Sequence, residues 1–317
     1  MVSTIEQISE DLNVPPQLVE NALRHAHVFY RKIRVPKRNG GYRTFIQPAT
    51  ELKMIHEWLT IRVLSALPLS SVATGFFPGA SILKNANVHR TSRYSVRVDL
   101  ENFFPSVQGD DLIQVIITSR SQLPALVANA DFTDLIKKAC FDNVGRLPVG
   151  YPTSPLIANA VMFSIDNELL DIVNSNSEMF GRSHLTRYAD DFVFSTDKTG
   201  ACRDFVATFR DLINRTASPN LRMNENKTRY MSRQGGSTLV TGLRINQDGI
   251  VRVHADYRDH VRLLLKHFAR GTLNSAEQRK LIGHLAFIEH ADPRLFTRLS
   301  YRYYVEIDRL RGKCTET

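Results

Sequence analysis

The chain has 317 residues, of which 43% are hydrophobic, and its 41 Lys and Arg against 32 Asp and Glu give a net charge of +9. This apolar fraction excludes a wholly disordered chain, and no stretch approaches the roughly 20 apolar residues of a membrane span. The acidic N-terminus is unlike a signal peptide, and three cysteines without metal-ligand spacing favour a reducing, cytoplasmic compartment. The basic excess favours a polyanionic partner, and nucleic acid is the first expectation.

The N-terminal part of the chain predicts short helices and a basic hairpin. Apolar spacing predicts helices over residues 4–12, 16–25 and 51–67, and strand-like runs around an Asn-Gly-Gly turn predict a hairpin over 31–46. Six basic residues and no acidic ones lie between positions 31 and 43. Such a hairpin either is simply solvated or binds phosphate groups.

The rest of the chain mixes strands and helices without regular alternation, which predicts an α+β fold. Strands are expected over 94–100 and 239–245, a hairpin over 185–195, and helices over 110–119, 123–140, 154–173 and 202–216. The segment after residue 254 has a mainly helical pattern and is rich in Lys and Arg.

Asp99 lies at the end of a predicted strand. Because side chains alternate across a strand, Val96, Val98 and Leu100 share one face, whereas Asp99 and Arg97 share the other. We therefore expect Asp99 to project from an open face of an antiparallel sheet. An aspartate that ends a strand and leads into a turn is the alternative.

A second acidic signal lies in Tyr188-Ala189-Asp190-Asp191, which has strand-like runs on both sides. Two adjacent like charges at the tip of a hairpin are unfavourable unless a cation or solvent relieves the repulsion. With Asp99 they supply three carboxylates, which could hold two Mg²⁺ ions about 4 Å apart for in-line phosphoryl transfer.

In the order of these acids, the chain resembles the reverse transcriptases, whose palm carries one Asp on a strand and a Tyr-x-Asp-Asp hairpin. The resemblance implies a right-hand polymerase fold with fingers, an antiparallel-sheet palm and a helical thumb, over residues 1–90, 91–245 and 246–317. It also implies that Asp99, Asp190 and Asp191 are catalytic and bind two Mg²⁺ ions together with Leu100.

The resemblance further implies a set of residues around the incoming dNTP. Lys37 and Arg43 match the positions that grip the triphosphate, and Lys227 matches a lysine near the leaving pyrophosphate or is merely exposed. Phe104 matches the aromatic gate that excludes a ribose 2′-hydroxyl; a buried core ring is the alternative, and the preceding phenylalanine is a second candidate. Val149 stands where most reverse transcriptases carry glutamine, so nucleotide positioning there is expected to depend on backbone or packing.

Two further elements are similar to those of the retron reverse transcriptases, bacterial enzymes that make branched RNA–DNA molecules. Asn85 and His89 match the ends of their Asn-Ala-x-x-His element, and Val240-Thr241-Gly242 match their Val-Thr-Gly element. A surface histidine and an ordinary strand end are the alternatives. The retron resemblance implies that both elements bind RNA. It also implies a cognate noncoding RNA, priming from a guanosine 2′-hydroxyl, an effector (toxin) protein from the same locus and a role in antiphage defence, with no membrane partner.

The predicted thumb carries Arg258, Arg262 and Lys266 at a spacing of four, which places them on one helix face. We expect this face to meet the phosphates of an A-like template–product duplex across its minor groove, or else to be simply solvated.

Other functions compete with this prediction. The bulk of Phe104 disfavours an RNA-dependent RNA polymerase. A catalytically silent RNA-binding scaffold is disfavoured because unneutralised acids beside a polyanion weaken binding. The two retron elements disfavour another bacterial defence or group II intron-like reverse transcriptase that works without a retron RNA.

Overall fold

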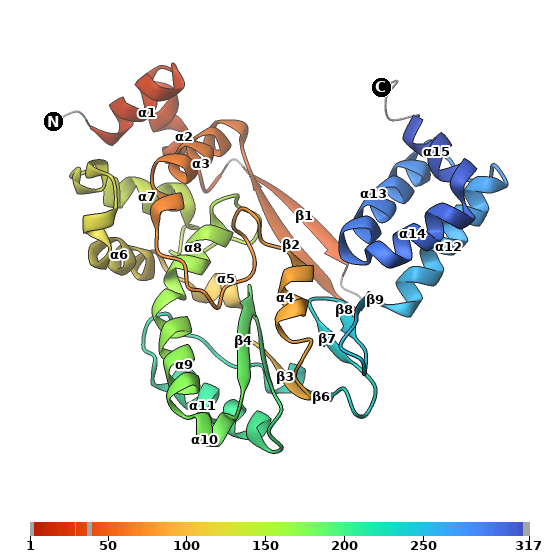
Figure 1. The fold of residues 1–317 in the computed structure, drawn as a ribbon. Helices are drawn as coiled ribbons and strands as arrows, with labels where there is room; N and C mark the ends of the chain where they lie inside the picture. The colour runs from red at the N-terminus through yellow and green to blue at the C-terminus, as the bar shows by residue number, and fades with distance from the viewer. Residues whose placement is uncertain (1–2, 29, 37–39, 313–317) are drawn as a thin grey trace.

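The computed structural model describes residues 3–28, 30–36 and 40–312 of the chain. Figure 1 shows helices on the N-terminal side, a central antiparallel sheet and a bundle of helices at the C-terminal end. The helices of the first part are α1 (Thr4–Leu12), α2 (Pro16–Arg24), α3 (Thr50–Arg62), α6 (Gly109–Thr118), α7 (Phe132–Cys140) and α8 (Ser154–Val161). They share one hydrophobic core with the central sheet.

The helices predicted at the N-terminus are confirmed. Helix α1 begins after Ser3, whose hydroxyl accepts from the Glu6 N–H (3.2 Å) while the Glu6 carboxylate accepts from the Ser3 N–H (2.7 Å). This capping box satisfies backbone donors that the helix itself leaves unpaired. Helix α3 ends at Arg62, earlier than predicted, and a 3₁₀ turn over Leu64–Ala66 follows it.

Strands β1 (Tyr30–Pro36) and β2 (Tyr42–Pro48) form the predicted basic hairpin, which runs as a long arm across the middle of Figure 1. Most of its side chains are exposed. At its base, the Ile46 N–H donates to the Val149 carbonyl (2.7 Å), and a Cβ on Gly150 would come within 2.8 Å of the Ile46 carbonyl oxygen. The hairpin is therefore fixed to the loop that leads into α8.

Four antiparallel strands in the order β4-β5-β3-β6 form the central sheet. Their bounds are β3 (Tyr94–Asp99), β4 (Ser183–Tyr188), β5 (Asp191–Thr196) and β6 (Arg229–Ser232). Helix α11 (Ala201–Arg215) packs on β3 and β5, where the Phe194 ring stacks on the Phe205 ring with centroids 4.4 Å apart. Helix α9 (Phe163–Ser175) packs beside α11 (Figure 1). The predicted strand, hairpin and helix of this region are confirmed.

Two predicted helices are broken in the structure. The 154–173 segment forms two helices, α8 and α9, and the 123–140 segment forms a 3₁₀ turn over Ala125–Ala128 followed by α7. Just before α7, Asp131 accepts hydrogen bonds from the N–H and hydroxyl of Thr4 (2.8 and 2.7 Å). These bonds fix the start of α7 against α1.

The predicted strand over 239–245 is wrong, because this segment is a hairpin. Strands β7 (Thr238–Val240) and β8 (Leu243–Ile245) are joined by Thr241 and Gly242, whose φ angles are 44° and 84°. Positive φ at both turn residues matches the twist of the flanking strands. The pattern hid the turn because threonine is a strong strand former.

A second hydrophobic core joins β7, β8 and β9 (Val251–Val253) to α4 (Ile82–Val88) and to the C-terminal bundle. The bundle consists of α12 (Ala255–Ala269), α13 (Ser275–Ala291), α14 (Pro293–Arg302) and α15 (Tyr304–Gly312), which confirms the helical prediction after residue 254. The short helices α5 (Phe103–Ser106) and α10 (Ser177–Phe180) complete the fold. The predicted boundaries at residues 90 and 245 stay predictions. Within the described parts of the chain, no helix is both long and apolar enough to cross a membrane.

Candidate active site

Three aspartates meet at one end of the central sheet. In the antiparallel register of β3 and β5, Asp99 lies directly opposite Asp191. Asp190 precedes Asp191 in the turn, and its carbonyl accepts from the Leu100 N–H (3.0 Å). The fold thus brings Asp99 to an adjacent pair of acids that lies about 90 residues further along the chain.

The turn that carries Asp190 has a strained backbone. It consists of Ala189 and Asp190, because Tyr188 pairs with Asp191 in the sheet. Ala189 has a φ of 57°, a left-handed conformation that costs a non-glycine residue on the order of 1 kcal/mol. The Arg187 guanidinium donates to the Ala189 carbonyl (3.3 Å) and so holds this peptide in place.

Arg187 is fully buried, and the sequence analysis missed it. Its Nε and Nη2 donate to the Asp166 carboxylate (2.8 and 2.6 Å), and its Nη1 donates to Asn159 (3.1 Å). A buried charge needs such partners, since loss of one leaves the other unpaired in the interior. This buried network therefore holds in place the β4–β5 hairpin, which carries Asp190 and Asp191. The available sequence signal was a charged residue within an otherwise strand-like run.

The strand face that carries Asp99 is more covered than predicted. Asp99 and Ser95 are each 2% exposed. The Ser95 hydroxyl donates to the Thr238 hydroxyl (3.2 Å) of β7, and the Lys227 side chain reaches Asp99. The expected open face is wrong at these two positions because a neighbouring hairpin and a lysine cover them. Arg97 between them is half-buried.

Burial and mutual repulsion raise the pKa values of Asp190 and Asp191. Burial raises the pKa of Asp190, and the charge of Asp99 raises it further. Burial also raises the pKa of Asp191 to about 6, against the lowering effect of Arg97. The Arg97 Nε donates to Asp191 (2.8 Å), and the Lys227 Nζ donates to Asp99 (2.7 Å). The site is an acidic cluster that these two cations partly neutralise.

The chemistry of this cluster fits a divalent cation. Carboxylate oxygens are the ligands that Mg²⁺ prefers, and a cation would relieve the repulsion among the three carboxylates. The Leu100 side chain is buried and has no donor atom, so this residue could add a ligand only through its backbone carbonyl. Among the residues that the structure describes, no three acidic, histidine or cysteine side chains are already arranged as a ligand set. Metal binding would therefore compete with the contacts of Lys227 and Arg97.

Of the residues predicted to bind the nucleotide, Arg43 and Lys227 lie beside the cluster, and Lys37 is outside the described residues. Arg43 of β2 is close enough for its charge to lower the pKa of Asp190. Lys227 is in direct contact with an aspartate, as described above. The Val149 carbonyl is hydrogen-bonded to β2, and the expectation that this position acts on the nucleotide through backbone or packing stays a prediction.

An aromatic cluster lies beside Tyr188, which pairs with Asp191 in the sheet. Phe103 is 3% exposed in the core, whereas Phe104 is half-buried, so Phe104 is the ring that can face a substrate. The Phe104 ring contacts Phe103 (centroids 5.4 Å apart) and Phe76 (6.5 Å), and Phe76 contacts Tyr188 (5.5 Å). The sequence analysis missed Phe76, because nothing local connects it to residues near 104 or 188.

The two elements predicted to bind RNA lie side by side. Helix α4, which carries Asn85, packs against the β7–β8 hairpin, and the Thr241 hydroxyl donates to the Ile82 carbonyl (3.3 Å). Val240 is fully buried in the second core, while Gly242 is exposed at the turn. Of the Val-Thr-Gly triplet, the turn residues are therefore the part that RNA could reach.

Asn85 and His89 are both 1% exposed, which differs from the predicted contact with RNA. The His89 Nδ1 is hydrogen-bonded to the Ser195 hydroxyl (2.7 Å) and its Nε2 to the Thr186 hydroxyl (2.8 Å). Burial lowers the pKa of His89 to about 3, so the ring is neutral. His89 therefore ties α4 to β4 and β5, because its partners are in the sheet and not in solvent.

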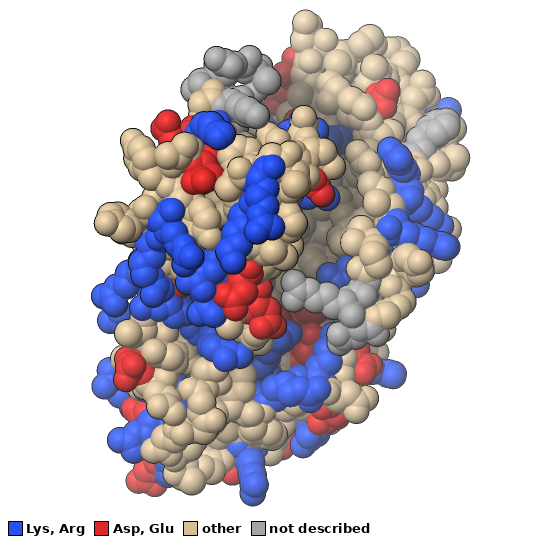
Figure 2. Space-filling model, turned by 90° about the vertical axis from the view of Figure 1, so that its right-hand side faces the viewer, with Lys and Arg blue, Asp and Glu red and all other residues tan. Residues whose placement is uncertain are grey.

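The predicted basic face of α12 is present. Asp259 accepts from Arg258 (2.9 Å) and from Arg262 (3.2 Å), which neutralises part of their charge, whereas Lys266 is exposed. Figure 2 shows Lys and Arg side chains spread beside a hollow on this side of the molecule. The hollow and its basic surroundings suit a polyanion.

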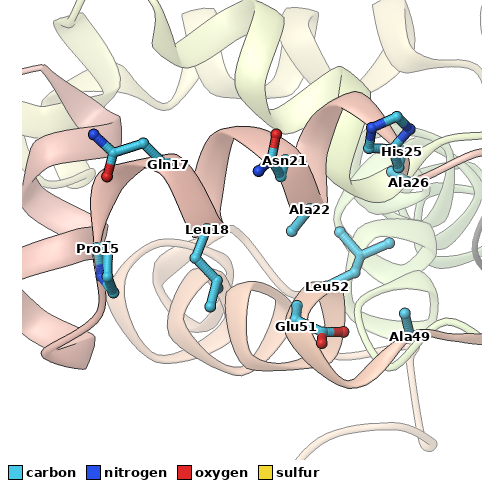
Figure 3. A pocket seen from close by; sticks show the side chains of 10 residues that line it. All are labelled: Pro15, Gln17, Leu18, Asn21, Ala22, His25, Ala26, Ala49, Glu51 and Leu52. Carbon is cyan, nitrogen blue, oxygen red and sulfur yellow. The ribbon is translucent and has the colours of Figure 1, made fainter.

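A groove between α2 and α3 is separate from this site (Figure 3). Its volume is about 700 Å³, and its lining is largely apolar, with Leu18, Ala22 and Leu52 among the side chains. The titratable lining residues are Glu51 and His25, and the three aspartates are not part of it. Its chemistry therefore does not compete with the acidic cluster as the candidate active site.

Comparison with known families agrees with this geometry. The sequence matches the family described as Reverse transcriptase (RNA-dependent DNA polymerase) over residues 35–284, a range that includes the three aspartates. The chain belongs to the reverse transcriptase family and is an RNA-directed DNA polymerase.

Its relatives narrow the assignment. The chain is 34% identical over 280 residues to Retron Ec73 reverse transcriptase of Escherichia coli, a match that covers 87% of this chain and 88% of the relative. It is 31% identical to Retron Mx65 reverse transcriptase of Myxococcus xanthus, over 86% of this chain and 64% of the relative. Within the family, the chain is therefore of the bacterial retron type.

Solved structures show the same fold. Telomerase from Candida albicans in complex with a fragment of telomeric RNA has a TM-score of 0.53 and 11% identity, covering 91% of this chain and 58% of the telomerase. Apo telomerase from Candida tropicalis, truncated of its C-terminal domain, has a TM-score of 0.50 and 15% identity, covering 72% and 55%. The chain thus spans little more than half of these proteins. The likeness confirms the predicted right-hand polymerase fold, an α+β fold with fingers, palm and thumb.

Proposed function

We propose that this enzyme copies part of a cognate structured noncoding RNA into branched multicopy single-stranded DNA (msDNA), starting from a guanosine 2′-hydroxyl. The proposal includes two Mg²⁺ ions, dNTP substrates and a location in the bacterial cytoplasm, where RNA and dNTPs are present. The observation that carries it is the convergence of Asp99, Asp190 and Asp191 at one end of β3 and β5.

The chemistry follows from the groups around these acids. Bound Mg²⁺ lowers the pKa of the attacking hydroxyl and neutralises charge on the triphosphate. The three aspartates hold the ions, and Arg43 on the hairpin supplies positive charge for the phosphates. The Lys227 Nζ, which pairs with Asp99 in the free enzyme, is available to turn to the leaving pyrophosphate and donate a proton to it. The Phe104 ring occupies the space that a ribose 2′-hydroxyl would need.

The RNA would be held by surfaces outside the acidic cluster. The exposed turn at Gly242 and the basic face of α12 support this part of the proposal, because phosphate contacts supply much of the affinity for nucleic acid. Asn85 and His89 would act indirectly, because they help to position α4, against which the turn packs. Retron membership supports an effector (toxin) protein from the same locus and a role in antiphage defence.

The proposal is tested by purifying the protein from cells that carry its own locus and sequencing the nucleic acid that copurifies. We expect DNA whose 5′ end is joined to an RNA guanosine, and a debranching enzyme should release it. Linear DNA without a branch would contradict the retron product, and RNA without DNA would contradict polymerase activity. Phage plating on cells with and without the locus tests the defence role.

A further inference from the structure

Residues 72–76 form a strap along β4, next to the candidate active site. The Arg187 N–H donates to the Val72 carbonyl (2.7 Å), and the Thr74 N–H and hydroxyl both donate to the Arg187 carbonyl (2.8 and 2.9 Å). The Asn159 side chain donates to the Gly75 carbonyl (2.9 Å). The strap is therefore fixed to the residue that immediately precedes the catalytic hairpin's Tyr-x-Asp-Asp sequence.

The end of the strap places one ring between the hairpin and the gate. Phe76 has a φ of 67°, a conformation that a phenylalanine adopts only when its surroundings enforce it. A Cβ on Gly75 would lie 2.9 Å from the Tyr188 ring, so that ring packs directly on the strap backbone. The Phe76 ring lies against Tyr188 (centroids 5.5 Å apart) and edge-on to Phe104 (6.5 Å).

We propose that Phe76 is a positioning residue for sugar selection: it braces the Phe104 ring in the orientation that excludes a ribose 2′-hydroxyl. This inference rests on the proposed polymerase function and on the gate role of Phe104. A half-buried phenyl ring can change rotamer, and its excluded volume is useful only where the ring is held still. Phe103 supports the gate from the core side, and Phe76 supports it from the strap side.

The test is the ratio of kcat/KM for dCTP to that for CTP, measured by single-nucleotide extension of a DNA primer on an RNA template. Phe76→Leu removes the edge-to-face ring pair, so it is expected to lower the ratio about two- to thirteenfold. Phe76→Tyr keeps the ring and should retain most of the discrimination. Because the ratio is internal to the active fraction, partial loss of folded protein does not change it.

Two controls separate bracing from general damage. Phe77→Leu alters the adjacent half-buried ring, for which the described structure shows no contact with Phe104, and should leave the ratio unchanged. Phe104→Ala should lower the ratio more than Phe76→Leu. In the double variant, Phe76→Leu should add no further loss to Phe104→Ala, because it acts through that ring.

The outcomes keep this inference distinct from the proposed function. An unchanged ratio in Phe76→Leu, with a lowered ratio in Phe104→Ala, overturns the brace and leaves the polymerase intact. Additive losses in the double variant overturn it too, because Phe76 would then contact the sugar itself. If wild-type protein extends no primer with dCTP, the proposed function fails instead.

Discussion

The acidic end of the central sheet and the contact between α4 and the β7–β8 hairpin are both marked in the sequence by short motifs, but they are built in opposite ways. At the acidic end, the motif side chains gather charge around one point, and basic groups from other elements surround them. At α4, Asn85 and His89 are buried. His89 is hydrogen-bonded to the neighbouring strands, whereas the Asn85 side chain has no hydrogen-bond partner in the described structure. A motif can therefore mark a packing that shapes a surface as readily as a group that touches a ligand.

We therefore expect substitutions in the two regions to cause different kinds of loss. Replacing the aspartates by asparagine should abolish catalysis and leave the fold intact, because carboxylate and amide are nearly the same size. Changes in the buried Arg187 network beside the β4–β5 hairpin, or in α4, should first lower the free energy of unfolding.

The largest effect is expected for Asp190→Asn combined with Asp191→Asn. The double variant loses two charged oxygen ligands, so DNA synthesis should fall by about 10³-fold or more, the scale seen when transition-state electrostatics are removed. Primer extension on an RNA template measures this, and RNA binding measured by fluorescence anisotropy should persist. Asp171→Asn changes an exposed acid on α9 and serves as the control. Normal product from the double variant would refute the metal assignment.

A large loss of stability is expected for Arg187→Met. It leaves Asp166 as a buried, unpaired charge, which typically costs about 3–5 kcal/mol in the free energy of unfolding. Urea denaturation measures the change, and Arg182→Met at an exposed position should have little effect. Adding Asp166→Leu to Arg187→Met should recover part of the loss. A loss no greater than that of Arg182→Met would show that the buried pair does not hold the hairpin.

A smaller effect is expected from pH, through His89. Its folded-state pKa of about 3 lies below the usual 6.5, so the unfolded chain binds more protons between these values. The stabilisation is therefore fully present above pH 6.5 and is lost as the pH falls toward 3, at up to about 1.4 kcal/mol per pH unit. His56, with a pKa lowered to about 4 by burial, acts in the same direction.

Urea denaturation at pH 7.5, 6.5 and 5.5 measures this dependence. His89→Gln should flatten the slope below pH 6.5, and the difference from wild type isolates His89 from acids that titrate in the same range. His290→Gln, at an exposed position, should leave the slope as it is. Equal slopes for wild type and His89→Gln would mean that His89 is not buried in solution.

The smallest effect is expected for Lys266→Gln on α12. Removal of one phosphate contact should weaken duplex binding modestly and lower the slope of log K against log salt by about one. Binding of an RNA–DNA duplex at several salt concentrations measures the slope. Lys53→Gln on α3 removes an exposed lysine far along the chain from this face and is the matched control. Identical slopes for both variants would remove α12 from the duplex interface.

The sequence predicted the local pieces of the site better than their surroundings. Apolar alternation predicted β3, and the acidic pair predicted the tip of a hairpin, but the expectation that Asp99 and Asp191 meet came from the resemblance to the reverse transcriptase palm. The partners of Arg187 and His89 could not be predicted, since Asp166, Ser195 and Thr186 approach them only through tertiary packing. The periodicity of apolar residues predicts which face of a helix or strand is buried, whereas these contacts depend on which helices and strands pack together.

Nor could the pattern reveal the true form of the 239–245 segment. It is rich in apolar and β-branched residues that are typical of strands, and a turn at Thr241 and Gly242 requires positive φ at a threonine. The burial of Asp99 was missed for a related reason, because its cover comes from Lys227, an element distant in sequence. Both errors arise where one segment closes over another.

The seam between β2 and the loop before α8 limits how the basic arm can move. Ile46 is hydrogen-bonded to Val149, and Gly150 fits against it with no room for a side chain. A rigid swing of the whole arm from its root would break this seam. Bending that keeps this seam intact is therefore confined to the part of the hairpin beyond Ile46, and we expect any movement of Arg43 toward a nucleotide to come from that part.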